Sequence, residues 1–192
     1  MKIESGVGNG KWAGVDLNNR LIVSAATVPQ SYVTSKEKEQ AYQVSGTATL
    51  ANATVVGMIL KNTSTTRNMV VTYVRHQIVD AAGGTAFPSA VCYFTLNVGC
   101  SYTSGGGVVT PVNVAVGSGN IAEVEAYDTN PTIAAGTEID RWYTKAEGDM
   151  YSYNKEGALI VQPGLSMCVS YIGDHTSGTL YSRVSFLMEN IV

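Results

Sequence analysis

The sequence has few charged residues and no long hydrophobic run, and each of these features excludes a class of partner. Charged residues are 14% of the 192 residues and the formal net charge is only −3, so the chain offers no general positive field for nucleic acid. No stretch reaches the roughly 18 apolar residues of a membrane-spanning helix, and residues 1–10 have no apolar centre of the kind that marks a signal peptide. We therefore expect no nucleic-acid partner and no membrane partner.

Cysteine and histidine are also scarce. Three cysteines, an odd number, do not make a disulfide framework, which favours synthesis and folding in a reducing cytoplasm. We interpret Cys92, Cys100 and Cys168 as small buried hydrophobes, of which Cys100, nearer a loop, is the most open to reaction. His76 is expected within a strand, partly buried with one hydrogen bond, and His175 in a polar turn. Neither has a metal-ligand spacing to another ligand, and we predict no metal, no cofactor and no catalytic residue.

Valine and threonine dominate what is present. The 24 valines and 19 threonines far outnumber the 9 leucines, alongside 20 glycines and 11 tyrosines. β-branched residues favour an extended chain, whereas leucine is the usual helix residue. The composition therefore predicts an all-β protein with many turns.

The clearest strand signals surround a polar segment at residues 63–68. The apolar run Val55–Leu60 precedes this segment and the alternating run Met69–Val79 follows it. Together they predict a β-hairpin with a turn of more than two residues. Two further alternating segments, Ser166–Ile172 and Thr179–Glu189, predict the last two strands.

Only one stretch has the composition of a helix. Thr34–Glu37 fits a capping box, a hydroxyl residue followed three positions later by glutamate. It opens the stretch Lys36–Tyr42, for which a helix and a charged loop are equal alternatives.

The predicted strands define the domain organisation. About eight to eleven strands with short turns indicate two antiparallel sheets packed as a β-sandwich, with at most one short helix. The glycines at positions 6, 8 and 10 before Lys11 do not match a phosphate-binding loop, which needs Ser or Thr after its lysine. Residues 1–12 are predicted to be an extended glycine-rich arm, and residues 13–192 a single β-sandwich domain.

Several segments, taken in order, resemble the small β-sandwich structural proteins of tailed bacteriophages, especially marine and cyanobacterial ones. The resemblance is one of layout and covers most of the chain. Its segments are Gly8–Val15, Asn19-Arg20-Leu21, Lys36–Tyr42, Leu60–Ser64, Val70–Ile78 and the Pro163-Gly164 turn.

This resemblance implies a jelly-roll virion protein without an active site. The favoured role is a capsid decoration or cement protein at the capsid surface, made in the host cytoplasm. Strand edges and the N-terminal arm would then contact copies of the same chain, with a homotrimer favoured, and the major capsid protein or other virion proteins. The alternative is a receptor- or glycan-binding module of a tail fibre or spike, with a host surface glycan as its partner.

Two pairs of carboxylates have the spacing of neighbours on one strand face. Glu123 with Glu125, and Glu138 with Asp140, are each two residues apart. Paired carboxylates serve glycoside hydrolysis or bind calcium, but no calcium-binding loop accompanies them. Charges on an edge strand also discourage unwanted strand pairing, and we favour this interpretation over a glycosidase or lyase.

Aromatic residues form the best candidate surface. Trp142, Tyr143, Tyr151 and Tyr153 cluster among charged residues, and Trp12 lies beside the glycine-rich arm. Tyr and Trp are enriched at interfaces because one end of each ring system tolerates water. These five residues are the candidate interface or glycan contacts. The alternative is a loop held to its own domain by the same rings.

Overall fold

The computed structural model divides the chain into two units, Met1–Gln30 and Ser31–Val192. It describes residues 2–4, 12–15, 21–22, 34–35, 38–51, 54–79, 92–134, 136–144, 149–175 and 177–191. The first unit holds one antiparallel sheet in the order β1 (Lys2–Glu4), β2 (Trp12–Val15), β3 (Leu21–Ile22). The predicted arm over residues 1–12 and the predicted domain over residues 13–192 stay predictions, because residues 5–11 and 16–20 lie outside the described residues.

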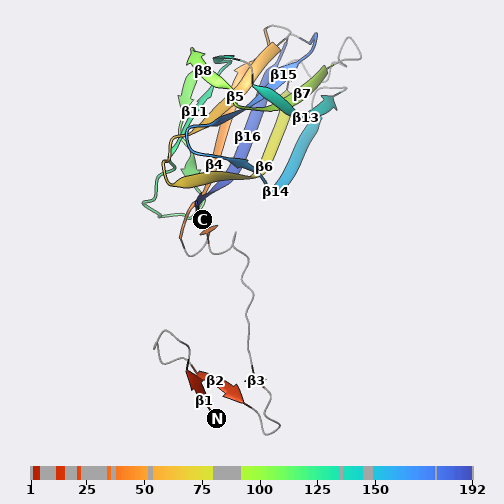
Figure 1. Cartoon of the computed structure of the whole chain (residues 1–192). Helices are drawn as coiled ribbons and strands as arrows, with labels where there is room; N and C mark the ends of the chain where they lie inside the picture. Colours follow the sequence, from red (N-terminus) through yellow and green to blue (C-terminus); the bar gives the residue numbers. More distant parts are fainter. Residues whose placement is uncertain are drawn as a thin grey trace. The chain divides into compact units, whose positions relative to one another are not determined.

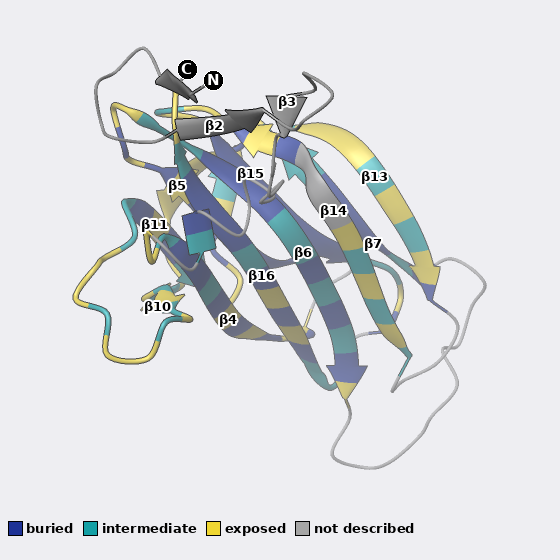
Figure 2. Cartoon of the chain, turned by 90° about the horizontal axis from the view of Figure 1, so that it is seen from below, coloured by how far each residue is buried: buried dark blue, intermediate teal, exposed yellow. Residues whose placement is uncertain are grey.

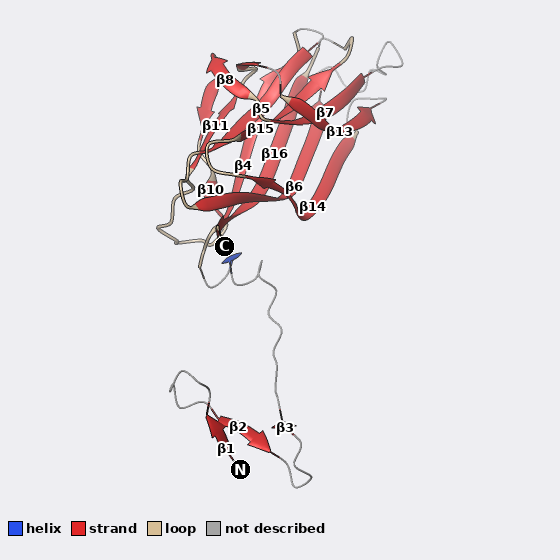
Figure 3. Cartoon of the chain, in the orientation of Figure 1, coloured by secondary structure: helices blue, strands red, loops and turns tan. Residues whose placement is uncertain are grey.

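The second unit contains two antiparallel sheets that lie face to face (Figures 1 and 3). We call them sheet I, with the order β10-β4-β16-β6-β14, and sheet II, with the order β13-β7-β15-β5-β11-β9; β8 and β12 form a separate pair. The strands are β4 (Ala41–Thr49), β5 (Thr54–Asn62), β6 (Arg67–Val79), β7 (Cys92–Val98), β8 (Ser101–Ser104), β9 (Gly107–Val109), β10 (Val112–Asn113), β11 (Val124–Asp128), β12 (Thr132–Ala134), β13 (Thr137–Thr144), β14 (Met150–Val161), β15 (Ser166–Ile172) and β16 (Thr179–Asn190).

Eight of these strands follow the path of a jelly roll. Counted along the chain they are β4, β5, β6, β7, β13, β14, β15 and β16, and their order is 1-8-3-6 in sheet I and 5-4-7-2 in sheet II. Successive strands therefore alternate between the sheets except at the step from β7 to β13, which is the arrangement of two interlocked Greek keys. The predicted all-β, jelly-roll-like sandwich is confirmed.

The predicted hairpin is wrong, because β5 and β6 lie in opposite sheets. β5 pairs with β15 and β11, whereas β6 pairs with β16 and β14. Residues 63–66 thus carry the chain across the sandwich instead of reversing it within one sheet. The apolar residues of Val55–Leu60 are buried on both faces of β5, and an uninterrupted apolar run is typical of such a strand.

Of the two equal alternatives for Lys36–Tyr42, the helix is not present in the part of this stretch that the structure describes. Residues 36–37 lie outside the described residues, Lys38–Gln40 is irregular, and β4 begins at Ala41. Glu39 has a φ of 51°, which a right-handed helix does not allow. Tyr42 stacks on Phe186 of β16 with ring centroids 5.7 Å apart, so packing against the last strand overrides the local helical composition.

The main core fills the space between the two sheets. Figure 2 shows buried and more exposed positions alternating along β4 and β16, as expected for strands with one face on the core. The predicted strands Ser166–Ile172 and Thr179–Glu189 are confirmed as β15 and β16. Core side chains include Tyr42, Val44, Met58, Leu60, Val74, Phe94, Leu96, Met167, Val169, Tyr171, Val184 and Phe186.

An insertion between β7 and β13 covers the outer face of sheet II. Within it, β10 extends sheet I beyond β4, while β11 and β9 extend sheet II beyond β5. A second apolar cluster forms where the insertion meets β5 and β15, and it accounts for the burial of both faces of these strands. The cluster consists of Val56, Ile59, Cys100 and Cys168, with Tyr127 and Ile133 packed against it.

Candidate functional site

Three of the predicted aromatic residues lie on the edge strands of the two sheets, on one side of the sandwich. Trp142 belongs to β13, and Tyr151 and Tyr153 belong to β14, which are the edge strands of sheet II and sheet I. The rings of Trp142 and Tyr153 are 5.6 Å apart, and the ring of Tyr151 is 5.5 Å from that of Phe94 in the core. All three side chains are half-buried, so part of each ring packs within the domain. Their role in an interface stays a prediction.

The other two predicted aromatic residues lie elsewhere. Tyr143 is 56% exposed on the opposite face of β13, where its ring is 5.7 Å from that of Tyr93. The Arg141 guanidinium lies 4.3 Å from the centre of the Tyr93 ring. Trp12 belongs to β2 of the first unit, and its side chain lies outside the described residues. The predicted set is therefore not one continuous surface within the second unit.

His76 lies behind the half-buried rings. It is almost fully buried, its ring centroid is 5.3 Å from that of Phe94, and its Nδ1 is 3.2 Å from Ser182 Oγ. Burial lowers the pKa of His76 to about 3, so the imidazole is neutral near neutral pH. Its Nε2 has no hydrogen-bond partner among the described residues. The expected single hydrogen bond is confirmed, and the burial is more complete than expected.

Cys92 lies at the end of the sandwich where the chain connects β15 to β16. Its thiol is 3.3 Å from Asp174 Oδ1 and accepts a hydrogen bond from the Tyr171 hydroxyl at 3.1 Å. Burial, reinforced by the contact with Cys92, raises the pKa of Tyr171. The backbone N–H of His175 donates to the same hydroxyl at 3.2 Å. Cys92 is completely buried. Its contacts with Asp174 and Tyr171 therefore anchor the turn after β15 to the interior of the domain. All three cysteines are buried, as predicted.

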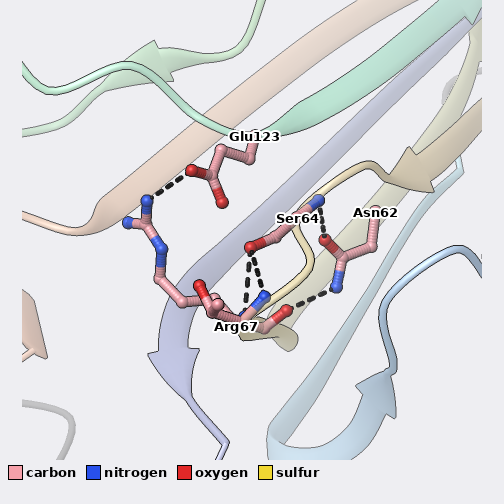
Figure 4. A network of polar contacts seen from close by, with 5 residues as sticks. Asn62, Ser64, Arg67 and Glu123 are labelled. Atoms are coloured by element: carbon pink, nitrogen blue, oxygen red, sulfur yellow. Dashed lines mark hydrogen bonds and ion pairs between the residues drawn. The ribbon is translucent and has the colours of Figure 1, made fainter.

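A polar network holds the link between β5 and β6 (Figure 4). The side chain of Asn62, fully buried, donates to the carbonyls of Arg67 and Val161, each at 2.9 Å, and accepts from the N–H of Ser64 at 3.0 Å. The Arg67 guanidinium donates to Glu123 at 2.7 Å. Hydrogen bonding to Ser64, together with Arg67, lowers the pKa of Glu123. The network joins the insertion to the crossing between the sheets.

The carboxylate pairs do not converge on a shared site. Glu138 receives two hydrogen bonds from Arg141, at 2.8 and 3.0 Å, and lies with Asp140 on the edge strand β13, as predicted. The same prediction is wrong for Glu123 and Glu125, because Glu123 precedes β11 and β11 lies between β5 and β9. In the described part of the chain no group of three or more His, Cys, Asp or Glu side chains is placed to hold a metal ion.

A shallow cleft of about 440 Å³ lies on the outer face of sheet I. Most of its lining comes from β4, β6 and β16, and Asp128 comes from β11. The cleft is lined by Ser45, Gly46, Thr47, Arg75, Gln77, Asp128, Tyr181, Ser182 and Arg183.

Two arginines stand side by side in this cleft. Arg183 of β16 pairs in register with Arg75 of β6 on one side and with Ser45 of β4 on the other. Like charges directly opposite each other destabilise a sheet, and in the described part of the chain neither arginine forms an ion pair with a carboxylate. The nearby Asp128 accepts hydrogen bonds from the Thr47 N–H and the Thr129 hydroxyl. The paired guanidinium groups suit a carboxylate, sulfate or phosphate.

Exposed apolar side chains gather in the insertion between Val108 of β9 and Ile121. Five large residues there are each more than half exposed, between 54% and 104%. A group of this kind is typical of a protein contact surface. We call it the valine segment; its members are Val108, Val112, Val114, Val116 and Ile121.

No family model, curated protein or solved structure matches this chain. Among the described residues, no helix is long and apolar enough to cross a membrane.

Sequence reasoning missed the arginine cleft and the valine segment. Alternation along β6 and β16 places Arg75 and Arg183 on outer faces, but their adjacency depends on a pairing between strands far apart in the sequence. Around Pro111 the chain forms only the short strands β9 and β10, which pair with β11 and β4. A short apolar run interrupted by Pro and Gly was the available signal that these side chains lack a core to join.

Proposed function

We propose that the protein is a non-enzymatic structural protein of a bacteriophage virion, a capsid decoration or cement protein. The observation that carries this proposal is the 1-8-3-6 and 5-4-7-2 strand order, since jelly rolls are the architecture of viral capsid domains, lectins and cupins. The layout resemblance supports the phage class. One fold hosts many functions. The choice among capsid domains, lectins and cupins therefore depends on what fills the interior and what the surfaces offer.

The interior favours a structural role. The space between the sheets is filled by apolar side chains such as Met58, Leu96, Met167 and Val184, all of which are essentially fully buried. A cupin-type enzyme instead keeps a cavity and its ligands inside the barrel. Here the features that remain accessible are on the outside, which suits a protein that acts by surface contact.

The valine segment is the surface that best fits protein contacts. Its side chains would bury apolar area against copies of the same chain, as in a trimer, or against the major capsid protein or other virion proteins. Edge strands β13 and β14 offer further contacts. Burying these surfaces on an assembled shell would reinforce the shell, because repeated sites on a symmetric shell bind repeated copies.

Light scattering on the purified chain tests the self-association. We expect a closed oligomer, a trimer being favoured, that dissociates in the double variant Val116→Ser/Ile121→Ser. The matched control is Val79→Ser, which removes an exposed apolar side chain at the end of β6. A wild-type monomer over the whole micromolar range would contradict the oligomer. Antibody labelling of particles of the phage that carries the gene should decorate the heads, and unlabelled heads would refute the capsid location.

A receptor- or glycan-binding module of a tail fibre or spike is the second candidate, favoured by the arginine cleft. Tyr181, 48% exposed, offers a ring for a sugar, and Arg75 and Arg183 offer charge for an acidic group. Titration with acidic and neutral oligosaccharides should then show binding of the acidic ones only, lost in Arg183→Gln and kept in Arg141→Gln. Loss in Trp142→Ala with an intact fold would instead place binding at the aromatic residues. No binding to any saccharide would remove this candidate.

A further inference from the structure

Two buried thiols lie in direct contact on the outer face of sheet II. Cys100 directly follows β7 and Gly99, and Cys168 belongs to β15. β15 pairs with β7 so that Cys168 lies opposite Asn97, and the N–H of Gly99 donates to the carbonyl of Ser166 at 2.8 Å, so the backbone brings Cys100 close to Cys168. Their Sγ atoms are 2.8 Å apart in a thiol–thiol hydrogen bond. A disulfide has an S–S distance of about 2.05 Å, so a sulfur shift of less than about 1 Å would join them.

The two thiols differ in access. Cys100 is 3% exposed and Cys168 is 0% exposed, and both pack in the apolar cluster beneath the insertion. A cleft of about 230 Å³ opens beside them, and Cys100 lines it while Cys168 does not. A small reagent entering the cleft therefore meets Cys100 first. Gly136 packs directly over Cys100, where a Cβ would collide with the Cys100 Sγ and the Val98 carbonyl.

The two thiols also differ in acidity. The hydrogen bond between the two thiols lowers the pKa of Cys100, with further help from backbone hydrogen bonds. The same hydrogen bond, together with burial, raises the pKa of Cys168. The thiolate is the reactive form of cysteine, so access and acidity both select Cys100 as the thiol that reacts first.

We propose that Cys100 and Cys168 are a disulfide-forming pair, in which Cys100 reacts with a low-molecular-weight disulfide such as oxidised glutathione and Cys168 resolves the product. The Cys100 thiolate attacks one sulfur of glutathione disulfide, and a glutathione thiolate leaves. Cys168 then loses its proton and attacks Sγ of Cys100, and the second glutathione thiolate leaves. Two protein thiols and one glutathione disulfide thus become one protein disulfide and two glutathione thiols, with two electrons passing to glutathione.

The cross-link would fasten the insertion to the sandwich. Its two ends are 68 residues apart and enclose β8 to β14, including the valine segment. Closing a loop of this length restricts the unfolded chain strongly. The pair fits a chain that folds with reduced thiols and is cross-linked after reaching an oxidising medium. This inference is independent of the proposed function.

Thiol counting on the full chain tests the proposal. The reduced protein is incubated with oxidised glutathione while folded, then denatured and titrated with a thiol reagent. We expect three thiols before oxidation and one after it, a mass lower by about 2 Da, a peptide that joins Cys100 to Cys168, and a higher Tm that dithiothreitol reverses. Cys92 is the internal control, since it contacts Asp174 and Tyr171 instead.

Single variants separate the two roles. Cys168→Ser should accumulate a glutathione adduct on Cys100, Cys100→Ser should leave Cys168 unreacted in the folded protein, and Cys92→Ser should form the disulfide as the wild type does. Tryptophan fluorescence confirms that each variant is folded. The proposal is overturned if folded wild-type protein keeps all its thiols, if Cys92 is consumed, or if the adduct forms on Cys168 as readily as on Cys100.

Discussion

Replacing Asn62 by alanine should destabilise the sandwich far more than a typical polar substitution. The Asn62 amide makes three hydrogen bonds, to the N–H of Ser64 and to the carbonyls of Arg67 and Val161. Asn62→Ala removes all three and leaves these backbone groups without that partner at the point where the chain crosses between the sheets. A buried polar group that loses its partner costs about 1–3 kcal/mol.

The expected loss follows from how deeply each partner is buried. The bonds to Ser64 and Val161 are buried, whereas the bond to Arg67 is only partly so, and water can replace part of the last. We therefore expect Asn62→Ala to lower the free energy of unfolding by about 2–5 kcal/mol. This is a large share of the roughly 5–15 kcal/mol of a typical domain.

Urea unfolding followed by tryptophan fluorescence measures this loss, because Trp142 packs against the main core between the sheets. The matched control is Asn190→Ala, at the exposed end of β16, which should change stability by less than about 0.5 kcal/mol. Asn62→Asp keeps the acceptor for Ser64 but turns an oxygen toward two carbonyls, so it should also destabilise. An Asn62→Ala protein within about 1 kcal/mol of wild type would refute the reasoning.

Three further predictions concern the core and its ionisation. The pKa of His76 is about 3 in the folded state and about 6.5 in the unfolded state, so the unfolded state takes up a proton first. Stability should fall from pH 6.5 toward pH 3 by up to about 1.4 kcal/mol per pH unit, with a shallower slope in His76→Gln as measured by urea unfolding. Gly136→Ala should lower Tm, because its Cβ would meet the Val98 carbonyl, and an unchanged Tm would contradict that packing. Phe186→Ala should cost about 3–5 kcal/mol, and a loss below about 1 kcal/mol would show that the core around Tyr42 collapses to fill the space.

Local pattern predicted the strands better than it predicted their partners. The alternation of Met167, Val169 and Tyr171 placed β15 correctly because one face of that strand meets the core. The hairpin failed because the polar turn residues at 63–66 serve a crossing between sheets as well as they serve a reversal. What distinguishes the two cases is the buried side chain of Asn62, whose partner Val161 lies 99 positions away.

The candidate surfaces show the same limit. Trp142 and Tyr153 were correctly grouped, since β13 and β14 are consecutive and face each other across the sandwich. Tyr143 lies on the other face of β13 because successive side chains of a strand point to opposite faces. Grouping residues by composition alone does not take this alternation into account. Contacts such as Arg75 with Arg183, and Cys100 with Cys168, depend on pairing between distant strands, which no local signal specifies.

The position of β16 sets when this protein can fold. β16 is the last of the strands that the structure describes, yet it lies between β4 and β6 and pairs with both along most of its 12 residues. A nascent chain that lacks only this strand leaves β4 and β6 with open edges, which are templates for aggregation. Sheet I is therefore completed only once β16 has been synthesised, and a nascent chain without β16 is the stage at which chaperone protection matters most.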